Sequence, residues 1–292
     1  MSSVGTLIRA VSSFYDVATE GRVLRCRARG HLRLDQIDPL PGDRVCFEPD
    51  PAHPNSGILT EILPRSNMLI RPSIANVDQI IFVACAARPG TDPFLIDRIS
   101  VKAEEIGCRL ILCLNKTDLD PADDLYALYS GCGFHVLRTS AFTGDGIDAL
   151  RATLSGRLSV LTGNSGVGKT SLLNRLLPDV DEKTAEISLK HGRGKHTTRR
   201  TELFPLPDGG WLADTPGFAA LDLTMISALK AGELAGCFPE FPVCECRFQD
   251  CLHYREPDCA VRNALASGAV SQSRYQSYLR MLEELQQSER SK

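Results

Sequence analysis

Apolar and polar positions alternate over short distances through residues 1–66. Gly- and Pro-rich turn signals such as "PLPGD" and "PNSG" separate the alternating segments at nearly regular intervals. This pattern predicts a small antiparallel β-barrel over residues 1–66. A barrel of this length with an Arg-rich strand fits an OB-type fold, a frequent nucleic-acid binder, although an SH3-like barrel fits the same pattern. The predicted strands lie in "SFYDVAT" (13–19), "RVLRCRAR" (22–29), "DRVCFEP" (43–49) and "GILTEIL" (57–63).

From about residue 67 the alternation gives way to longer apolar runs. "QIIFVACA" (79–86) and "RLILCLN" (109–115) flank an amphipathic segment at 92–107, which predicts a β-α-β unit in a buried, mostly parallel sheet. Three later segments continue the series of strands that end in polar loops: "GFHVLRTSA" (133–141), "RLSVLTG" (157–163) and "GWLADTPG" (210–217). We therefore expect an α/β domain over residues 67–222, with its ligand at the carboxyl ends of the strands.

After about residue 222 the sequence becomes helix-like, which predicts a mainly α domain over residues 223–292. Its last amphipathic stretch, 271–287, places five apolar or aromatic residues near one helical face. These are Tyr275, Tyr278, Leu279, Leu282 and Leu285.

Bulk composition limits the class of protein. The 292 residues are 43% hydrophobic and carry a net charge of −3, which is ordinary for a soluble chain of two or three domains. With no run of about 18 apolar residues and no secretory signal in residues 1–13, we expect no membrane span and a cytoplasmic location. Two segments are locally basic, 22–33 and 190–200, each with five Lys or Arg and no acid. Both are candidates for phosphate-facing patches, and a solvated loop or polar strand face is the alternative.

The segment "GNSGVGKTS" (163–171) fits the pattern Gly-x4-Gly-Lys-Ser/Thr. It follows an apolar strand and opens a helical stretch, the context that a phosphate-binding loop requires, and this argues against a Gly-rich turn with a chance Lys. Backbone N–H groups of such a loop face the β-phosphate, Lys169 adds a cation for the β and γ oxygens, and Thr170 ligates Mg²⁺. We assign the whole loop to nucleotide binding: Gly163, Asn164, Ser165, Gly166, Val167, Gly168, Lys169, Thr170 and Ser171.

A second motif, "NKTD" (115–118), predicts a choice of guanine. The Asp118 carboxylate can accept hydrogens from guanine N1 and N2, which adenine does not offer, and a buried unpaired carboxylate rejects the wrong base. Asn115 can bind the N7 edge and brace the phosphate loop, and the stem of Lys116 can pack on the base. The segment "TSA" (139–141) follows the next strand, so that the N–H of Ala141 can bind guanine O6. The predicted guanine residues are Asn115, Lys116, Thr117, Asp118, Ser140 and Ala141.

The segment "DTPG" (214–217) ends another apolar strand. Alone it is more often a turn, but downstream of a phosphate loop it predicts that Asp214 holds Mg²⁺ through water and that the Gly217 N–H meets the γ-phosphate. The order of the motifs is unusual, because the guanine loop and "TSA" precede the phosphate loop and "DTPG". A cyclic shift preserves a sheet and its site while moving the chain ends. The sequence therefore predicts a circularly permuted P-loop GTPase domain.

The basic segment 190–200 lies between the phosphate loop and "DTPG", where a first switch is expected. Thr197 or Thr198 is the candidate that closes on Mg²⁺ with γ-phosphate, and we favour Thr198. Phe218 follows Gly217 at the place where Ras-like enzymes carry the Gln that orients the attacking water. Hydrolysis by the isolated chain should therefore be slow. His196 is the candidate that replaces the Gln, and an exposed residue that contacts RNA phosphates or nothing is the alternative. The predicted catalytic residues are His196, Lys169 and Thr198.

Five of the eleven Cys residues crowd into 237–259, whereas Cys85, Cys108 and Cys113 sit singly in apolar runs as expected buried hydrophobes. Cys246, Cys251, His253 and Cys259 give the spacing Cys-x4-Cys-x-His-x5-Cys. Three thiolates and one imidazole make the closed ligand set of a structural zinc site, with no open position for catalysis. Cys244 is a rival for the first ligand, and unligated core thiols are the alternative.

Together, the barrel, "NKTD…TSA…GNSGVGKTS…GKHTT…DTPGF" and the Cys-x4-Cys-x-His-x5-Cys tail resemble the family of ribosome small subunit-dependent GTPase A over nearly the whole chain. The resemblance implies an assembly factor of the small (30S) ribosomal subunit that hydrolyses GTP when stimulated by that subunit, and dissociates afterwards. It implies that the barrel and the zinc domain touch 16S rRNA, with His196 as the family's proposed catalytic His and Phe218 as its hydrophobic residue after "DTPG". The segment "HTTRR" lacks a third Thr that relatives often carry, and the barrel is short.

The expected function is therefore GTP hydrolysis to GDP and phosphate in late maturation of the small subunit. The expected cofactors are one structural Zn²⁺ and Mg²⁺ with GTP, and the expected state is a monomer. The sequence leaves two alternatives, a GTP-gated RNA-binding module with incidental hydrolysis and an assembly factor of the large subunit. Asp118 argues against an adenine-specific ATPase.

Overall fold

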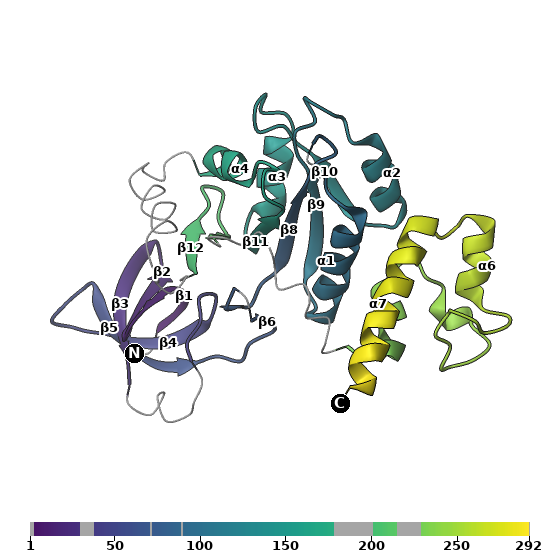
Figure 1. Ribbon diagram of the computed structural model, residues 1–292. Helices are drawn as coiled ribbons and strands as arrows, with labels where there is room; N and C mark the ends of the chain where they lie inside the picture. The colour runs from purple at the N-terminus through teal and green to yellow at the C-terminus, as the bar shows by residue number, and fades with distance from the viewer. Residues whose placement is uncertain are drawn as a thin grey trace. The chain divides into compact units, whose positions relative to one another are not determined.

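The chain folds into two compact units, which we describe in turn from a computed structural model (Figure 1). The first unit comprises the described parts of residues 1–80, 148–162 and 170–219, and the second those of residues 81–147, 163–169 and 220–292. The structure describes residues 3–29, 38–70, 72–88, 90–177, 201–214 and 229–291.

The first unit begins with a closed barrel of five strands. In spatial order β1 pairs with β2, β2 with β3, β3 with β5, β5 with β4, and β4 returns to β1. Only β3 and β5 run parallel to each other. The strands are β1 (Ser3–Val11), β2 (Phe14–Thr19), β3 (Arg22–Ala28), β4 (Arg44–Pro49) and β5 (Ser56–Ile62). This closed order with one parallel pair is the topology expected of an OB-type barrel.

The barrel core contains one buried side chain or more from every strand. Alternate residues point inward, as the period of a strand requires. The fully buried apolar residues are Leu7, Val17, Leu24, Cys26, Val45, Phe47 and Leu59. The sequence pattern predicted strands β2 to β5 but not β1, although Leu7 on β1 is 0% exposed and closes the core.

The remaining strands of the first unit continue the sheet from strand β1 of the barrel. β11 (Leu158–Gly163) runs parallel to β13 (Trp211–Asp214), β13 pairs antiparallel with β12 (Glu202–Pro205), and β12 pairs antiparallel with β1. Strand β12 was not predicted from the sequence pattern. The first unit also contains the antiparallel pair β6 (Met68–Leu69) and β7 (Ile74–Ala75), and helix α3 (Ile147–Leu154).

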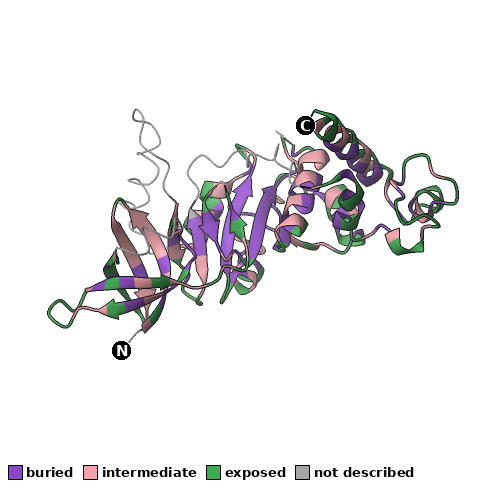
Figure 2. Ribbon diagram, turned by 90° about the horizontal axis from the view of Figure 1, so that it is seen from below, coloured by how far each residue is buried: buried purple, intermediate pink, exposed green. Residues whose placement is uncertain are grey.

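The second unit contains three neighbouring strands in the order β10-β9-β8, with β9 and β10 parallel. They are β8 (Gln79–Ala84), β9 (Arg109–Leu114) and β10 (His135–Arg138), with helices α1 (Pro93–Glu105) and α2 (Asp123–Gly131) between them along the chain. β8 is buried along its whole length, and its residues after Gln79 are all apolar, as expected of a strand in a buried parallel sheet (Figure 2). Helix α1 starts where Asp92 accepts the N–H of Phe94 at 3.0 Å and Pro93 occupies the first turn. Cys85, Cys108 and Cys113 are buried, as predicted.

The second unit also contains the helical C-terminal part of the chain. Its elements are the 3₁₀ helices η2 (Ala231–Cys237) and η3 (Val243–Glu245), and the α-helices α6 (Ala260–Ser267) and α7 (Gln272–Arg290). The predicted face of the last helix is confirmed: Tyr275, Tyr278, Leu282 and Leu285 are buried and Leu279 is partly buried. This face packs with Phe238 and Phe241, whose rings stack at 4.7 Å, and with Val101 of α1. None of the helices in the described ranges is long and apolar enough to cross a membrane.

Candidate nucleotide site and metal centre

The loop after β11 has the backbone that a phosphate-binding loop needs. β11 ends at Gly163, the loop turns through Gly166 and Gly168, both at positive φ, and helix α4 (Lys169–Leu176) follows. A Cβ on Gly163 would collide with the carbonyl oxygen of Val83, and one on Gly168 would collide with the side-chain amide of Asn115. Only glycine therefore permits the loop to lie against β8 and against the guanine motif.

Lys169 is the first residue of helix α4, directly after this loop. Its Nζ donates to the carbonyl oxygens of Gly163 at 2.7 Å and of Asn164 at 2.5 Å. Burial lowers the pKa of Lys169. A bound phosphate would favour the charged form, so the surroundings of Lys169 suit an anion. Of the other predicted loop residues, Val167 is buried, Asn164 is half-buried, and Ser165, Gly166, Thr170 and Ser171 are exposed.

The side chain of Asn115 joins three loops. Its Nδ2 donates to the carbonyl oxygen of Val167 at 2.8 Å. Its Oδ1 accepts from the N–H of Ala141 at 3.1 Å and from the hydroxyl of Thr139 at 3.2 Å. Asn115 is only 1% exposed, so its carboxamide has little access to water and depends on these protein hydrogen bonds. One carboxamide thus holds the guanine motif, the "TSA" segment and the phosphate loop together.

Asp118 is exposed but held in place from one side. Its Oδ1 accepts the hydroxyl of Ser140 at 2.5 Å, and that hydroxyl accepts the N–H of Thr143 at 3.1 Å. Thr117 donates through both its N–H and its hydroxyl to the carbonyl oxygen of Thr139. Lys116 adopts a left-handed backbone, with φ of 65°, which turns the chain between Asn115 and Asp118. The two segments predicted to read guanine therefore lie side by side.

The residues predicted around the γ-phosphate are only partly within the described ranges. Asp214 is the last residue of β13. His196, Thr197, Thr198, Gly217 and Phe218 lie outside the described residues, so their assignments stay predictions.

Sequence reasoning missed one residue of this site. Thr139 lies in "TSA" and has no predicted role, and yet its hydroxyl donates to the Oδ1 of Asn115 and lies 3.2 Å from the Sγ of Cys113. A buried threonine at the end of a strand was the available signal, because its hydroxyl needs a partner.

Cys246, Cys251, His253 and Cys259 form a compact cluster, with one candidate ligand atom from each within 4.8 Å of the others. The Nδ1 of His253 lies 3.4 Å from the Sγ of Cys246 and of Cys259, and these two Sγ atoms are 3.9 Å apart. Four ligands at tetrahedral Zn–S and Zn–N bond lengths are spaced by about 3.5–3.8 Å, so the cluster has the size of a zinc site. Cys244, the rival first ligand, is exposed and outside this group.

Hydrogen bonds from outside the cluster hold its loop. Tyr275 donates to the carbonyl oxygen of His253 at 2.7 Å, and Tyr278 donates to that of Leu252 at 2.7 Å. Glu256 accepts the backbone N–H groups of Leu252 and Tyr254, and although burial opposes it, such bonds lower the pKa of Glu256 to about 2. Burial raises the pKa of Cys251 to about 12, so a thiolate there needs a cation nearby. The cluster fits a structural zinc with all four positions filled by protein.

The fold and the order of its loops define a class of protein, the circularly permuted P-loop GTPases with an N-terminal OB-type barrel and a C-terminal helical Cys/His domain. YloQ, a circularly permuted GTPase, superposes with a TM-score of 0.83 at 34% identity, over 98% of this chain and 96% of that one. YjeQ from Thermotoga maritima superposes with a TM-score of 0.85 at 35% identity, over 98% and 99% of the two chains. The predicted fold class is thereby confirmed.

The particular family follows from the sequence matches. Residues 62–224 match the RsgA GTPase family, and residues 4–57 match the RsgA N-terminal domain. The small ribosomal subunit biogenesis GTPase RsgA of Moorella thermoacetica is 45% identical over 291 residues, which are 98% of this chain and 99% of that protein. The protein of the same name from Caldanaerobacter subterraneus is 41% identical over 98% of this chain. The chain belongs to the RsgA GTPase family.

Proposed function

We propose that this protein hydrolyses GTP to GDP and phosphate during biogenesis of the small ribosomal subunit, and that contact with the subunit triggers hydrolysis. One observation carries the nucleotide assignment. The buried Asn115 carboxamide ties the guanine motif to the phosphate loop, although 52 residues separate Asn115 from Val167 and their order is reversed relative to Ras-like proteins. The relatives' shared name, small ribosomal subunit biogenesis GTPase, supports the choice of subunit.

Each part of the site has a distinct task in this proposal. The loop N–H groups, the start of α4 and Lys169 bind the β- and γ-phosphates of GTP, because all three place positive charge there. Asp118 reads the guanine N1 and N2 edge, and Ser140 orients its carboxylate. The Ala141 N–H, which donates to the Oδ1 of Asn115 here, would be shared with guanine O6 when the base is bound. Thr170 and Asp214 offer the hydroxyl and carboxylate oxygens that Mg²⁺ prefers. Mg²⁺ bound there would neutralise charge on the phosphate oxygens.

Water activation is the step that the chain alone performs poorly in this proposal. Phe218 follows Gly217, and its ring has no group that can orient water. We assign that task to His196, placed by the bound subunit, with Thr198 preferred over Thr197 for the Mg²⁺ contact in the triphosphate state. The barrel and the Cys/His domain then supply contacts to 16S rRNA.

Adding purified small subunits is expected to raise phosphate release by at least about tenfold, since activation of GTPases in trans commonly exceeds this. Large subunits at the same concentration serve as the control and should have little effect. His196→Ala should remove the stimulation while GTP still binds, as measured by displacement of a fluorescent GTP analogue.

The same experiment separates the alternatives. Absence of stimulation in a preparation that demonstrably binds GTP would overturn the triggered-enzyme proposal. A His196→Ala variant that still supports subunit maturation in cells would favour a GTP-gated RNA-binding module. Stimulation by large subunits alone would favour the large-subunit role.

We also assign one structural Zn²⁺ to the cluster of Cys246, Cys251, His253 and Cys259. Cys251→Ser is expected to reduce the bound zinc from one ion per chain to a small fraction, and to unfold the helical C-terminal part, because a structural zinc site contributes directly to folding. Zinc content by atomic absorption and helix content by circular dichroism are the measurements. Cys244→Ser is the matched control and should keep the full zinc content. Loss of zinc in that variant would show that Cys244, and not Cys246, is the first ligand.

A further inference from the structure

Two exposed apolar side chains lie in the loops predicted to read guanine. Phe142 is 83% exposed and Leu119 is 70% exposed, and among the residues that the structure describes no other large apolar residue is as exposed as either. Leu119 directly follows Asp118, and Phe142 lies two residues after Ser140, whose hydroxyl donates to the Asp118 carboxylate. Single exposed apolar residues are ordinary, but two at one ligand site indicate that part of the ligand is apolar.

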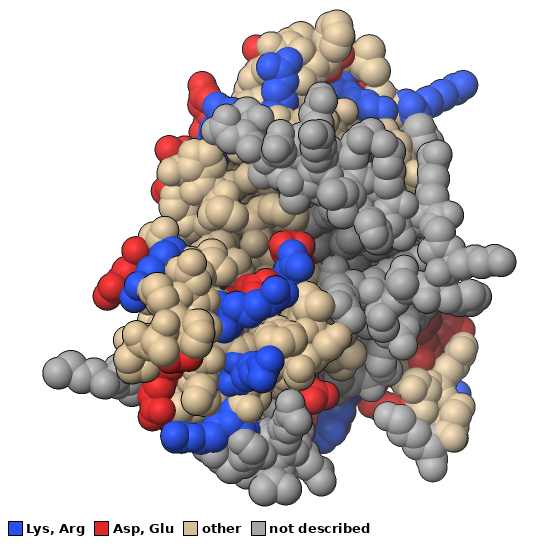
Figure 3. Space-filling view, turned by 90° about the vertical axis from the view of Figure 1, so that its left-hand side faces the viewer, with Lys and Arg blue, Asp and Glu red and all other residues tan. Residues whose placement is uncertain are grey.

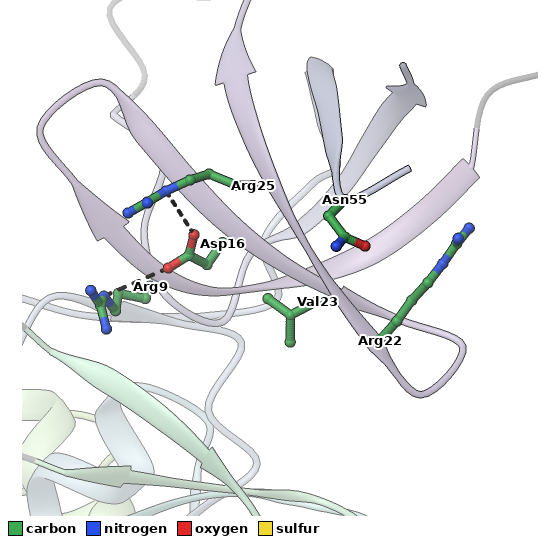
Figure 4. A pocket seen from close by; sticks show the side chains of 6 residues that line it. All are labelled: Arg9, Asp16, Arg22, Val23, Arg25 and Asn55. Carbon is green, nitrogen blue, oxygen red and sulfur yellow. Dashed lines mark ion pairs between the residues drawn. The ribbon is translucent and has the colours of Figure 1, made fainter. Parts of the chain in front are cut away.

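The hollow on the barrel surface has a different character. Its lining consists of three arginines, Asp16, Asn55 and a single apolar residue, Val23 (Figure 4). Basic and acidic side chains are also interspersed on the surface seen in Figure 3. Such a surface suits a charged ligand. The guanine loops instead combine one carboxylate with apolar side chains, which suits a ligand with a polar edge and an apolar face, as a nucleobase has.

Hydrogen bonds fix the backbone on both sides of Phe142. On one side Ala141 donates its N–H to the Oδ1 of Asn115 at 3.1 Å. On the other side Thr143 donates its N–H to the hydroxyl of Ser140, also at 3.1 Å. The ring is therefore carried by a defined turn, with most of its surface in water. Because the turn is already ordered, little conformational freedom is lost when a ligand covers the ring.

The position of this turn places the ring next to a bound base. In the proposed site the Ala141 N–H binds guanine O6, and the Asp118 carboxylate binds the N1 and N2 edge. Both contacts lie in the plane of the base and leave its two faces uncovered. The stem of Lys116 is the candidate for one face. The Cα of Phe142 is only about 3.8 Å from that of Ala141, so the ring of Phe142 is within reach of the other face.

We propose that the Phe142 ring stacks on the face of guanine that Lys116 leaves open. The stacking rests on the nucleotide site proposed above, to which it adds a residue outside the nucleotide motifs. Every base has a π face, so stacking strengthens binding without choosing between bases. Asp118 then supplies the choice of guanine, and Phe142 supplies affinity. Because GDP and GTP carry the same base, the ring strengthens binding of both by the same factor.

Phe142→Ala is expected to weaken binding of GDP and of a non-hydrolysable GTP analogue by the same factor, about tenfold, which is within the usual effect of removing a base–aromatic contact. Calorimetric titration of the full chain in the presence of Mg²⁺ measures both affinities. Phe142→Tyr keeps an aromatic ring and should keep the affinity. Phe248→Ala is the matched control, because it removes another exposed phenylalanine, 40% exposed, that lies outside the nucleotide loops. It should change neither affinity.

A second ligand separates stacking from a general effect on the shape of the loop. Inosine diphosphate lacks the N2 amino group of GDP, so it loses one hydrogen bond to Asp118 but keeps an aromatic face. Phe142→Ala should therefore weaken binding of GDP and of inosine diphosphate equally. If the alanine instead displaced Asp118, GDP would lose more affinity than inosine diphosphate, because only GDP offers the amino group to that carboxylate.

A single tryptophan gives a direct signal of stacking. Trp211 is the only tryptophan of the chain, so the double variant Phe142→Trp, Trp211→Phe has one indole, at position 142. Guanine stacked on an indole quenches its fluorescence, so GDP should lower the emission in proportion to the bound fraction. The double variant Phe248→Trp, Trp211→Phe is the control and should keep its emission when GDP binds.

Three outcomes would overturn the stacking of Phe142. They are unchanged GDP affinity in Phe142→Ala, a larger loss of affinity for GDP than for inosine diphosphate, and unchanged emission of the indole at position 142 when GDP is bound. Each of them would leave the nucleotide site intact, because GDP still binds to the wild-type chain. Failure of the wild-type chain to bind GDP would instead reject the nucleotide site itself.

Discussion

Replacing Arg274 with methionine is expected to lower the free energy of unfolding by about 3–5 kcal/mol, the usual effect of removing one partner from a buried ionic network. The guanidinium of Arg274 is 0% exposed. It donates to Asp97 at 2.7 Å and to the two carboxylate oxygens of Glu240 at 2.6 and 3.1 Å. Burial opposes its charge, but Glu240 and Asp97 outweigh burial and raise the pKa of Arg274. Without Arg274, the two buried carboxylates of Asp97 and Glu240 would lose the cation that they share.

The network joins helices that are distant in sequence. Arg274 is on α7, Asp97 is on α1, and Tyr129 of α2 donates its hydroxyl to Asp97 at 2.8 Å. Helix α2 begins five residues after Asp118. Loss of Arg274 should therefore loosen both the packing of the C-terminal helix and the support of the helix that follows the guanine motif.

Urea unfolding followed by far-ultraviolet circular dichroism, with zinc present throughout, measures the effect. Arg280→Met is the matched control on the same helix, because the Arg280 side chain is 62% exposed and its pair with Glu284 should contribute at most about 1 kcal/mol. The triple variant Asp97→Asn, Glu240→Gln, Arg274→Met removes every charge of the network and should recover part of the loss. A loss for Arg274→Met no larger than that for Arg280→Met would contradict the buried-network argument.

Local patterns predicted most of the elements and motifs, because their signals lie within a few residues of one another. The strand-loop-helix context of "GNSGVGKTS" and the apolar runs of β8 and β9 are of this kind. The Cys/His spacing predicted a cluster that the structure contains, because its four residues lie within 246–259.

The missed features depend on contacts between distant segments. Arg9 pairs with Glu202, which lies 193 residues away in the sequence, and the periodicity of neither strand predicts this pair. Strand β1 was not predicted because only two of its nine residues, one of them Leu7, are buried, so its alternation is weak. Arg274 shares the buried face of α7 with Tyr275 and Tyr278. A charged residue there is assigned to solvent by any polarity pattern, unless its partners Asp97 and Glu240 are known.

Asp118→Asn is expected to reduce affinity for GTP by about 10² and to create affinity for xanthosine triphosphate. The Asp118 carboxylate offers two acceptors to the N1 and N2 hydrogens of guanine, and each lost or reversed bond costs about 1–3 kcal/mol. Asparagine presents an N–H group to the guanine amino group, so two donors face each other. Xanthine carries a carbonyl in place of that amino group and can accept from the asparagine amide. The hydroxyl of Ser140 can still donate to the amide oxygen, so the loop should keep its shape.

Competition of GTP, xanthosine triphosphate and ATP against a fluorescent analogue measures the preference of each variant. Asp120→Asn is the matched control, because it removes the same charge two residues away, and an asparagine can still accept the N–H of Ala122 as Asp120 does at 2.9 Å. That variant should keep the guanine preference. If Asp118→Asn bound GTP as tightly as wild type, the base would be read elsewhere, and the side-by-side placement of Asp118 and Ser140 would serve only the loop. A gain of xanthosine triphosphate binding in Asp118→Asn alone would place the N1 and N2 edge of guanine against this carboxylate. It would thereby fix the direction in which the base enters between the guanine motif and the "TSA" segment.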